Sequence, residues 1–118
     1  MKIAITADGK DLNSMLDERF GRCKYFIFAD SETMEFKALD NTYSDSAHGV
    51  GVEVAQFVID QGVDTLITGN LGPNAAKVLS ESGITIYNAG SMTVNQAIDL
   101  YKQGKLTKMS GPTTNPHK

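Results

Sequence analysis

The segment TLITGNLGPN, residues 65–74, carries the pattern that decides the fold. Its first four residues are β-branched or apolar and predict a short buried strand, and a Gly-rich turn follows. Pro73 then opens a helix that extends to about Ser82, where Gly83 ends it before a second strand at 84–87. Strand, helix and strand in this order predict an α/β fold with parallel strands.

The rest of the chain extends this unit on both sides. Short apolar or alternating runs predict three strands upstream, at 3–5, 25–29 and 35–39. Apolar residues with helical spacing predict two further helices, at about 50–61 and 94–103. This order predicts an antiparallel meander followed by α-β-α-β-α in one mixed sheet, in which the strands near Leu66 and Thr85 run parallel to the first.

Two polar segments and a tail connect or follow these elements. Residues 8–22 and 41–51 are polar and contain glycine, so they predict loops, and the first is long for a compact domain. Residues 110–118 hold two prolines and no apolar anchor, which predicts a flexible tail. We therefore expect a single α/β domain over residues 1–109, because a chain of 118 residues can bury one core.

Composition and charge argue against several classes of protein. The formal net charge is −3 and acidic and basic residues are interleaved, which argues against nucleic-acid and membrane partners. The first residues have a strand pattern rather than that of a signal peptide, and no apolar run reaches the length of a membrane span, so we expect a cytoplasmic protein. The single cysteine, Cys23, fits a reducing compartment.

The loop segment LDERFGRC, residues 16–23, places a thiol beside two guanidinium groups. Positive charge from Arg19 and Arg22 is expected to lower the pKa of Cys23 and to favour the thiolate, which binds soft metals. The alternative interpretation is structural: Cys23 is a small buried residue at the start of a strand, and Phe20 packs over the core at a glycine bend. The residues alone leave both interpretations open.

Two further loops carry candidate ligands or donors. His48 lies in a small-residue loop before the helix at 50–61, where it is either a metal ligand or an ordinary surface or capping residue. The turn at 69–72 precedes a helix N-terminus, whose N–H groups and dipole favour an anion, although a tight structural turn uses the same glycines. Gly72 and Asn74 are the candidate residues there.

No set of residues that would catalyse a reaction is evident. The two histidines, His48 and His117, are isolated from any nucleophile signature, and CxxC and HExxH motifs are absent. We therefore expect a binding protein rather than an enzyme.

Short motifs along most of the chain are similar to those of one known family. They are Asp17-x-x-Phe20-Gly21-Arg22-Cys23, Leu66-Ile67-Thr68-Gly69, Gly72-Pro73-Asn74-Ala75, Ile86-Tyr87 and Leu100-Tyr101. In their order and spacing, from Met1 to about Leu106, the chain resembles the dinitrogenase iron-molybdenum cofactor biosynthesis family. The resemblance implies a ribonuclease H-like α/β fold without the nuclease carboxylates, and a protein that binds, carries or stores iron-molybdenum cofactor or its precursors.

The same resemblance bears on the cargo. In nitrogenase-associated members a histidine stands immediately before Phe-Gly and is implicated in cofactor binding, whereas this chain has Arg19 there. The chain therefore resembles the stand-alone members, one of which holds a molybdenum-copper sulfide cluster. The resemblance implies an iron-, molybdenum- or copper-containing sulfide cluster, and cluster donor or acceptor proteins as partners.

An anionic cluster needs positive side chains and N–H donors. The predicted cofactor-binding residues are Asp17, Arg19, Phe20, Gly21, Arg22, Gly72 and Asn74, and the predicted metal ligands are Cys23 and His48. We expect the 17–23 loop and the His48 loop to face each other at one end of the sheet. One thiolate does not hold a permanent cubane, so easy release of the cargo is expected, as suits a carrier or chaperone. The alternative is a regulatory or scaffold module that binds a protein or a small anion without metal.

Overall fold

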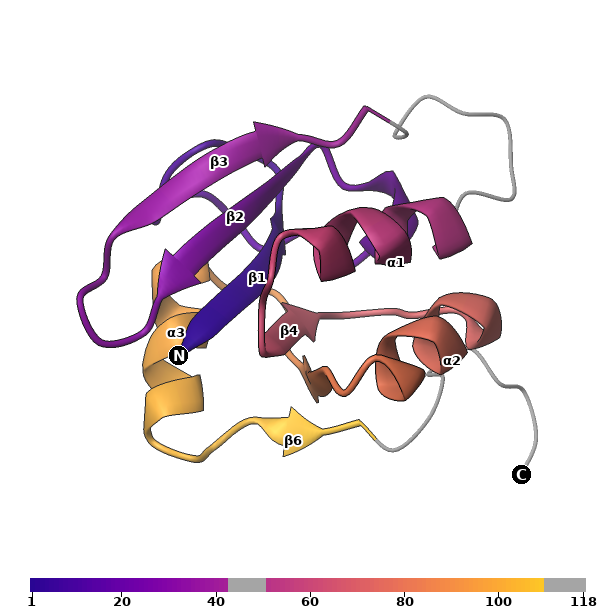
Figure 1. Ribbon diagram of the computed structural model, residues 1–118. Helices are drawn as coiled ribbons and strands as arrows, with labels where there is room; N and C mark the ends of the chain where they lie inside the picture. Colours follow the sequence, from indigo (N-terminus) through magenta and orange to yellow (C-terminus); the bar gives the residue numbers. More distant parts are fainter. Residues whose placement is uncertain (43–50, 110–118) are drawn as a thin grey trace.

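Six strands and three helices make up the part of the chain that the structure describes, residues 1–42 and 51–109 of the computed structural model (Figure 1). The strands are β1 Lys2–Ala7, β2 Tyr25–Asp30, β3 Phe36–Asp40, β4 Thr65–Thr68, β5 Thr85–Asn88 and β6 Thr107–Lys108. The helices are α1 Gly51–Asp60, α2 Pro73–Glu81 and α3 Val94–Lys102, and one 3₁₀ turn, η1, covers Phe20–Arg22. The predicted tail at 110–118 lies outside the described residues.

The strands form one mixed sheet in the order β3-β2-β1-β4-β5-β6. β1 pairs antiparallel with β2 and parallel with β4, whereas β2 and β3 form an antiparallel hairpin and β4 and β5 are parallel. The predicted meander, the α-β-α-β-α continuation and the ribonuclease H-like arrangement are therefore confirmed.

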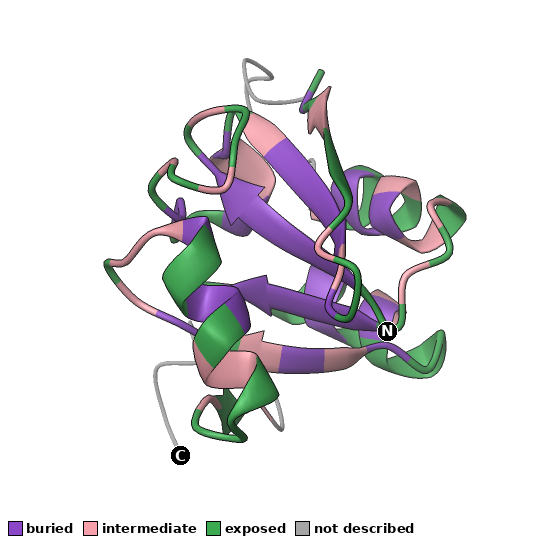
Figure 2. Cartoon of the chain, turned by 90° about the vertical axis from the view of Figure 1, so that its left-hand side faces the viewer, coloured by how far each residue is buried: buried purple, intermediate pink, exposed green. Residues whose placement is uncertain are grey.

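Helices cover both faces of the sheet. Because successive strand side chains point to opposite faces, β1 sends Ala4 into the core cluster under α1 and α2, and Ile3 and Ile5 into the cluster under α3. Figure 2 shows the strands as the most continuously buried part of the molecule. On the first face, the ring of Phe26 lies 5.8 Å from that of Phe20, centroid to centroid, so this packing holds η1 against the core.

The glycines that follow the three helices have the backbone conformation that a helix end requires. Gly62, Gly83 and Gly104 have φ angles of 75°, 83° and 71°, in the left-handed region where residues with a Cβ are strained.

The segment at 8–22, predicted as a loop, is more ordered than expected. Leu16 forms a bridge with Ala7, Arg19 forms one with Asn70, and η1 closes the segment. A segment that crosses the end of a sheet has to satisfy its backbone groups, and here other loops supply the partners. The short strand β6 was not predicted, because its two residues are exposed and carry no apolar pattern.

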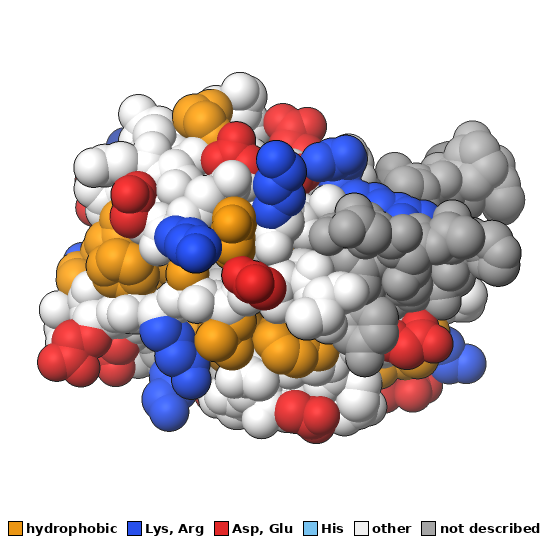
Figure 3. All heavy atoms as spheres, turned by 90° about the horizontal axis from the view of Figure 1, so that it is seen from above, with side chains coloured by type: hydrophobic (Ala, Val, Ile, Leu, Met, Phe, Trp, Pro, Cys, Tyr) orange, Lys and Arg blue, Asp and Glu red, His pale blue; other side chains and the backbone are white. Residues whose placement is uncertain are grey.

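Charges are mixed on the surface. On the face shown in Figure 3, acidic and basic side chains are interspersed, as their interleaving in the sequence predicts. Among residues 1–42 and 51–109, no helix is long and apolar enough to cross a membrane.

Candidate functional site

The candidate site lies where the chain leaves the two central strands. After β1 the chain continues to β2, toward one edge of the sheet, and after β4 it continues to β5, toward the opposite edge. A crevice forms at such a reversal, beyond the carboxyl ends of the parallel strands, and α/β proteins commonly bind ligands there. The segment at 8–22 and the turn at 69–72 meet at this crevice.

Hydrogen bonds from the strand ends fix the first of these segments. Thr6 and Thr68 are fully buried, and their Oγ1 atoms lie 2.9 Å apart. The Thr6 hydroxyl donates to the carbonyl of Asp17, whose own N–H donates to the carbonyl of Thr6. Asp17 is therefore tied to β1 and, through the threonine pair, to β4.

Gly69 allows the two segments to touch. A Cβ atom at this position would lie 2.7 Å from Glu18 Cα and 2.5 Å from Glu18 Cβ, so a larger residue does not fit without a shift. Beside it, the Asn70 N–H donates to the Glu18 carbonyl and the Phe20 N–H donates to the Asn70 carbonyl. Asn70 also borders both of the cavities at this end of the molecule.

The first of these, which we name the polar cavity, has a volume of about 520 Å³. It is lined by Asp8, Leu16, Asp17, Glu18, Arg19, Lys24, Asn70 and Ser91. Arg19 Nε donates to Asp17 Oδ1 at 3.1 Å and Nη2 donates to Oδ2 at 3.0 Å. The Asp17 side chain is 8% exposed and that of Arg19 is 64% exposed, so the carboxylate is the fixed partner. The hydrogen bond and the charge of Asp17 raise the pKa of Arg19, and the carboxylate offsets the positive charge of the guanidinium.

The second, which we name the helix-end cavity, has a volume of about 220 Å³. It is lined by Phe20, Gly21, Gly51, Val52, Asn70, Gly72, Pro73, Asn74 and Ala75, and none of these is charged. α1 begins at Gly51 and α2 at Pro73, so the first turns of two helices border it. No side chain caps α2. The first N–H groups of a helix have no partner within it, and with the helix dipole they favour an anion.

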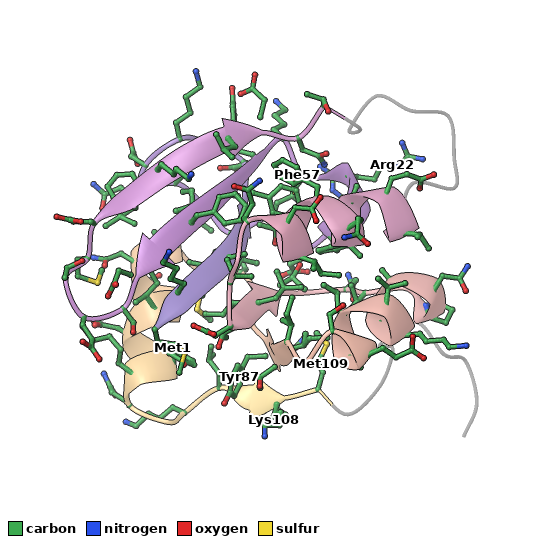
Figure 4. All side chains as sticks on the ribbon, in the orientation of Figure 1. Met1, Arg22, Phe57, Tyr87, Lys108 and Met109 are labelled. Carbon is green, nitrogen blue, oxygen red and sulfur yellow. The ribbon has the colours of Figure 1, made fainter. Side chains whose placement is uncertain are left out.

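The two predicted arginines belong to different surroundings. Arg19 lines the polar cavity and is paired with Asp17. Arg22 is the last residue of η1, which packs against α1, and Figure 4 shows its side chain above α1 on the side of the N-terminal end.

Cys23 lies in the core rather than in either cavity. It is fully buried in the cluster under α1 and α2, and its thiol donates to the Phe20 carbonyl at 3.4 Å. Burial raises the pKa of this thiol to about 12, and the charge of Asp17 adds to the effect. The expectation that Arg19 and Arg22 lower the pKa is therefore wrong, because desolvation of the sulfur dominates. The structural interpretation fits the placement of Cys23, and its role as a metal ligand stays a prediction.

The other predicted metal ligand, His48, lies outside the described residues. So does the predicted contact between its loop and the 17–23 loop. Within residues 1–42 and 51–109, no three side chains of His, Cys, Asp or Glu form a group that could hold a metal ion.

Comparison with known proteins decides the family. The family model described as dinitrogenase iron-molybdenum cofactor matches residues 1–104. The chain belongs to this family. The apo form of the orange protein from Desulfovibrio gigas has the same fold, with a TM-score of 0.91 and 34% identity over 96% of both chains.

Two further relatives support this placement in the dinitrogenase iron-molybdenum cofactor family. A Thermotoga protein solved by NMR has a TM-score of 0.83 and is 38% identical over 97% of both chains. An uncharacterised protein, MJ0580, from Methanocaldococcus jannaschii is 36% identical over 111 residues, which are 92% of this chain and 91% of that protein.

In this member of the family, the structure divides the motif that runs from Asp17 to Cys23. Asp17 and Arg19 line the polar cavity, and Cys23 lies in the core. Four predicted cofactor-binding residues meet at the helix-end cavity, namely Phe20, Gly21, Gly72 and Asn74. Their binding roles stay predictions.

Sequence reasoning missed three residues that shape the site. Asn70 lies in the Gly-rich turn at 69–72 that the sequence already marked as a candidate anion site, so its position between Gly69 and Gly72 could have identified it. Thr6 is a polar residue within the run at 3–7, whose other residues are apolar, and this also marks it. The third residue is Asn41, whose side-chain amide bonds to the carbonyls of Gly21 and Cys23. It gives no such signal in the sequence, because an asparagine after a strand is typical of any turn.

Proposed function

We propose that this protein binds an anionic metal-sulfide cluster, or a precursor of one, in the helix-end cavity and passes it to other proteins without catalysing a reaction. Membership of the dinitrogenase iron-molybdenum cofactor family supports the class of cargo. The observation that carries the proposal is the cavity itself, which the first turns of α1 and α2 border and whose described lining residues include no carboxylate.

The uncharged lining matters for the strength of binding. Sulfide and oxide ligands of a metal cluster accept hydrogen bonds, and the first turns of α1 and α2 supply N–H donors without the desolvation cost of a buried lysine or arginine. Arg22, whose side chain lies above α1 on the side of its N-terminal end, adds positive charge at this end of the helix. The polar cavity suits an anion less well, because three carboxylates, from Asp8, Asp17 and Glu18, line it.

The same lining favours release. The described wall holds no thiol or imidazole, since Cys23 faces the core, so the cargo is held there by hydrogen bonds and charge rather than by metal coordination. Contacts of this kind exchange faster than thiolate bonds, as a carrier requires.

The proposal is tested by anaerobic incubation of the protein with tetrathiomolybdate, with and without copper(I), and with iron and sulfide. Visible absorption and metal analysis after gel filtration then give the cargo bound per chain. Gly72→Val is the decisive variant: Gly72 lines the cavity, a Cβ there meets nothing within 4 Å and the φ angle of −73° is ordinary, so a larger side chain is added to the wall without backbone strain.

The matched control is Ser80→Val, which adds a similar side chain on the exposed side of the same helix. We expect Gly72→Val to lose most of the bound metal and Ser80→Val to retain it, with circular dichroism showing that both are folded. Equal uptake by the two variants contradicts the assignment of the cavity. No uptake by the parent from any of the metals offered contradicts cluster binding itself.

A second candidate function has one observation in its favour. At about 220 Å³ and without a metal-coordinating side chain in its described wall, the helix-end cavity also suits a small anion that contains no metal. A regulatory module of this kind binds phosphate or sulfate in competition with tetrathiomolybdate, which isothermal titration measures directly.

A further inference from the structure

Asn41 is a buried polar residue at the end of β3, next to the turn at Phe20–Cys23. It is 4% exposed and directly follows β3. Its N–H donates to the Lys24 carbonyl at 2.9 Å, which continues the pairing of β2 with β3 by one step. The position of its side chain is therefore set by the strand pair rather than by a free loop.

The amide of Asn41 bonds to the turn that forms one wall of the helix-end cavity. Nδ2 lies 3.2 Å from the carbonyl oxygen of Gly21, 2.8 Å from that of Cys23 and 3.8 Å from Cys23 Sγ. The Cys23 thiol in turn donates to the Phe20 carbonyl. Three carbonyls of the turn thus receive their hydrogen bonds from two buried side chains.

We propose that Asn41 is a positioning residue for the helix-end cavity. With the Cys23 thiol, its amide holds the Phe20–Cys23 turn in the conformation in which Phe20 and Gly21 line the cavity. The effect of Asn41 on binding in the cavity rests on the proposed function. Its effect on the conformation of the Phe20–Cys23 turn, which we call the hold on the turn, does not.

The physical argument is one of donors and acceptors. A buried amide costs free energy unless its N–H groups are bonded, and here they bond to the carbonyls of Gly21 and Cys23. When the donor is removed, the buried Cys23 carbonyl loses this partner, and opening of the turn lets water replace it. Opening of the turn exposes Cys23 Sγ, so alkylation of this thiol reports the event.

The test uses Asn41→Asp, which replaces the donor with a carboxylate oxygen facing three acceptors at nearly unchanged volume. The folded protein is treated with iodoacetamide at pH 8 and the alkylation rate of Cys23 is followed by mass spectrometry. We expect at least a tenfold faster rate than in the parent, and about tenfold weaker binding of tetrathiomolybdate. Asn41→Ser retains one donor on a shorter side chain and is expected to fall between, and it replaces the aspartate variant if that variant does not fold.

The control is Ile98→Val, a change in the core cluster under α3, on the opposite face of the sheet. It lowers overall stability without touching the turn, so its alkylation rate and its affinity for tetrathiomolybdate should stay within about twofold of the parent.

Each outcome decides one part of the inference. An unchanged alkylation rate in the Asn41 variants overturns the hold on the turn, and so does a faster rate that Ile98→Val matches. Faster alkylation with unchanged affinity for tetrathiomolybdate overturns the role in the cavity. If the parent does not bind tetrathiomolybdate, the proposed function fails for this probe and the cavity role fails with it, while the alkylation rates still decide the hold on the turn.

Discussion

The two cavities at the carboxyl end of the sheet share Asn70 and differ in the charge of the residues that line them. The polar cavity is lined by ionised side chains, and one of its cations, Arg19, is already paired with Asp17. None of the described residues that line the helix-end cavity is charged, and the first turns of α1 and α2 border it. The difference teaches that the loop richest in charged residues is not the place best suited to an anion. Charges that pair with each other offset one another, so their attraction for a bound anion is weak.

The contact on which both cavities depend can be broken at Gly69. Gly69→Ala places a Cβ within 2.8 Å of Glu18 backbone and side-chain atoms, so we expect a loss of about 2–3 kcal/mol in the free energy of unfolding. Urea denaturation measures this loss. Gly90→Ala is the matched control, since its Cβ meets nothing closer than 3.8 Å, and it should change stability by much less. Equal effects would show that the close approach at Gly69 is not a constraint.

The anchor of the polar cavity alone is removed by Thr6→Val. This change leaves the Asp17 carbonyl without its hydroxyl donor in the interior, which we expect to cost about 1–2 kcal/mol in urea denaturation. Thr68→Val keeps the bond from Thr6 to Asp17 and should cost less. A larger loss in Thr68→Val than in Thr6→Val would contradict this order of bonding.

The burial of Cys23 behind the helix-end cavity predicts a dependence of stability on pH. The thiol ionises near pH 9 in the unfolded chain and near 12 in the folded protein, so above pH 9 the unfolded state binds fewer protons and stability falls as pH rises. The slope from this residue is at most about 1.4 kcal/mol per pH unit. Cys23→Ala should show a shallower decline between pH 9 and 10.5, and parallel curves for the two proteins would indicate an accessible thiol.

The smallest effect is expected for Arg19. Because Asp17 offsets its charge and it lines the other cavity, Arg19→Gln should weaken the binding of tetrathiomolybdate by less than about threefold. Gly72→Val provides the contrast, with most of the binding lost. A tenfold or larger loss in Arg19→Gln at low salt would move the proposed site to the polar cavity and reverse the comparison.

The sequence predicted most of the fold because its signals are local. The apolar runs at 25–29 and 65–68 and the glycines at the helix ends each have one favoured conformation, and the order of the elements limits the topology to a few choices. The strand β6 was missed because two exposed residues make a strand only when β5 supplies the partner.

The candidate site was predicted less completely, since it depends on where side chains point. The sequence places Cys23 beside two arginines, but it does not reveal that the sulfur turns into the core while Arg19 turns to Asp17. Likewise, Asn41 and Gly21 are 20 residues apart, and only the pairing of β2 with β3 brings them together. Contacts between distant segments decide these roles, and no local pattern encodes them.

The parallel pairing of β1 with β4 also bears on how the chain folds as it is synthesised. Thr6 and Thr68, which meet in the folded protein, are 62 residues apart in the sequence. β1 can pair with β2, and β2 with β3, early in synthesis, but the other edge of β1 stays open until β4 has left the ribosome. Non-local pairing of this kind slows folding, and an open apolar strand edge is prone to association with other chains. Asn70, which borders both cavities, follows β4, so neither cavity can form in a nascent chain before β4 has emerged.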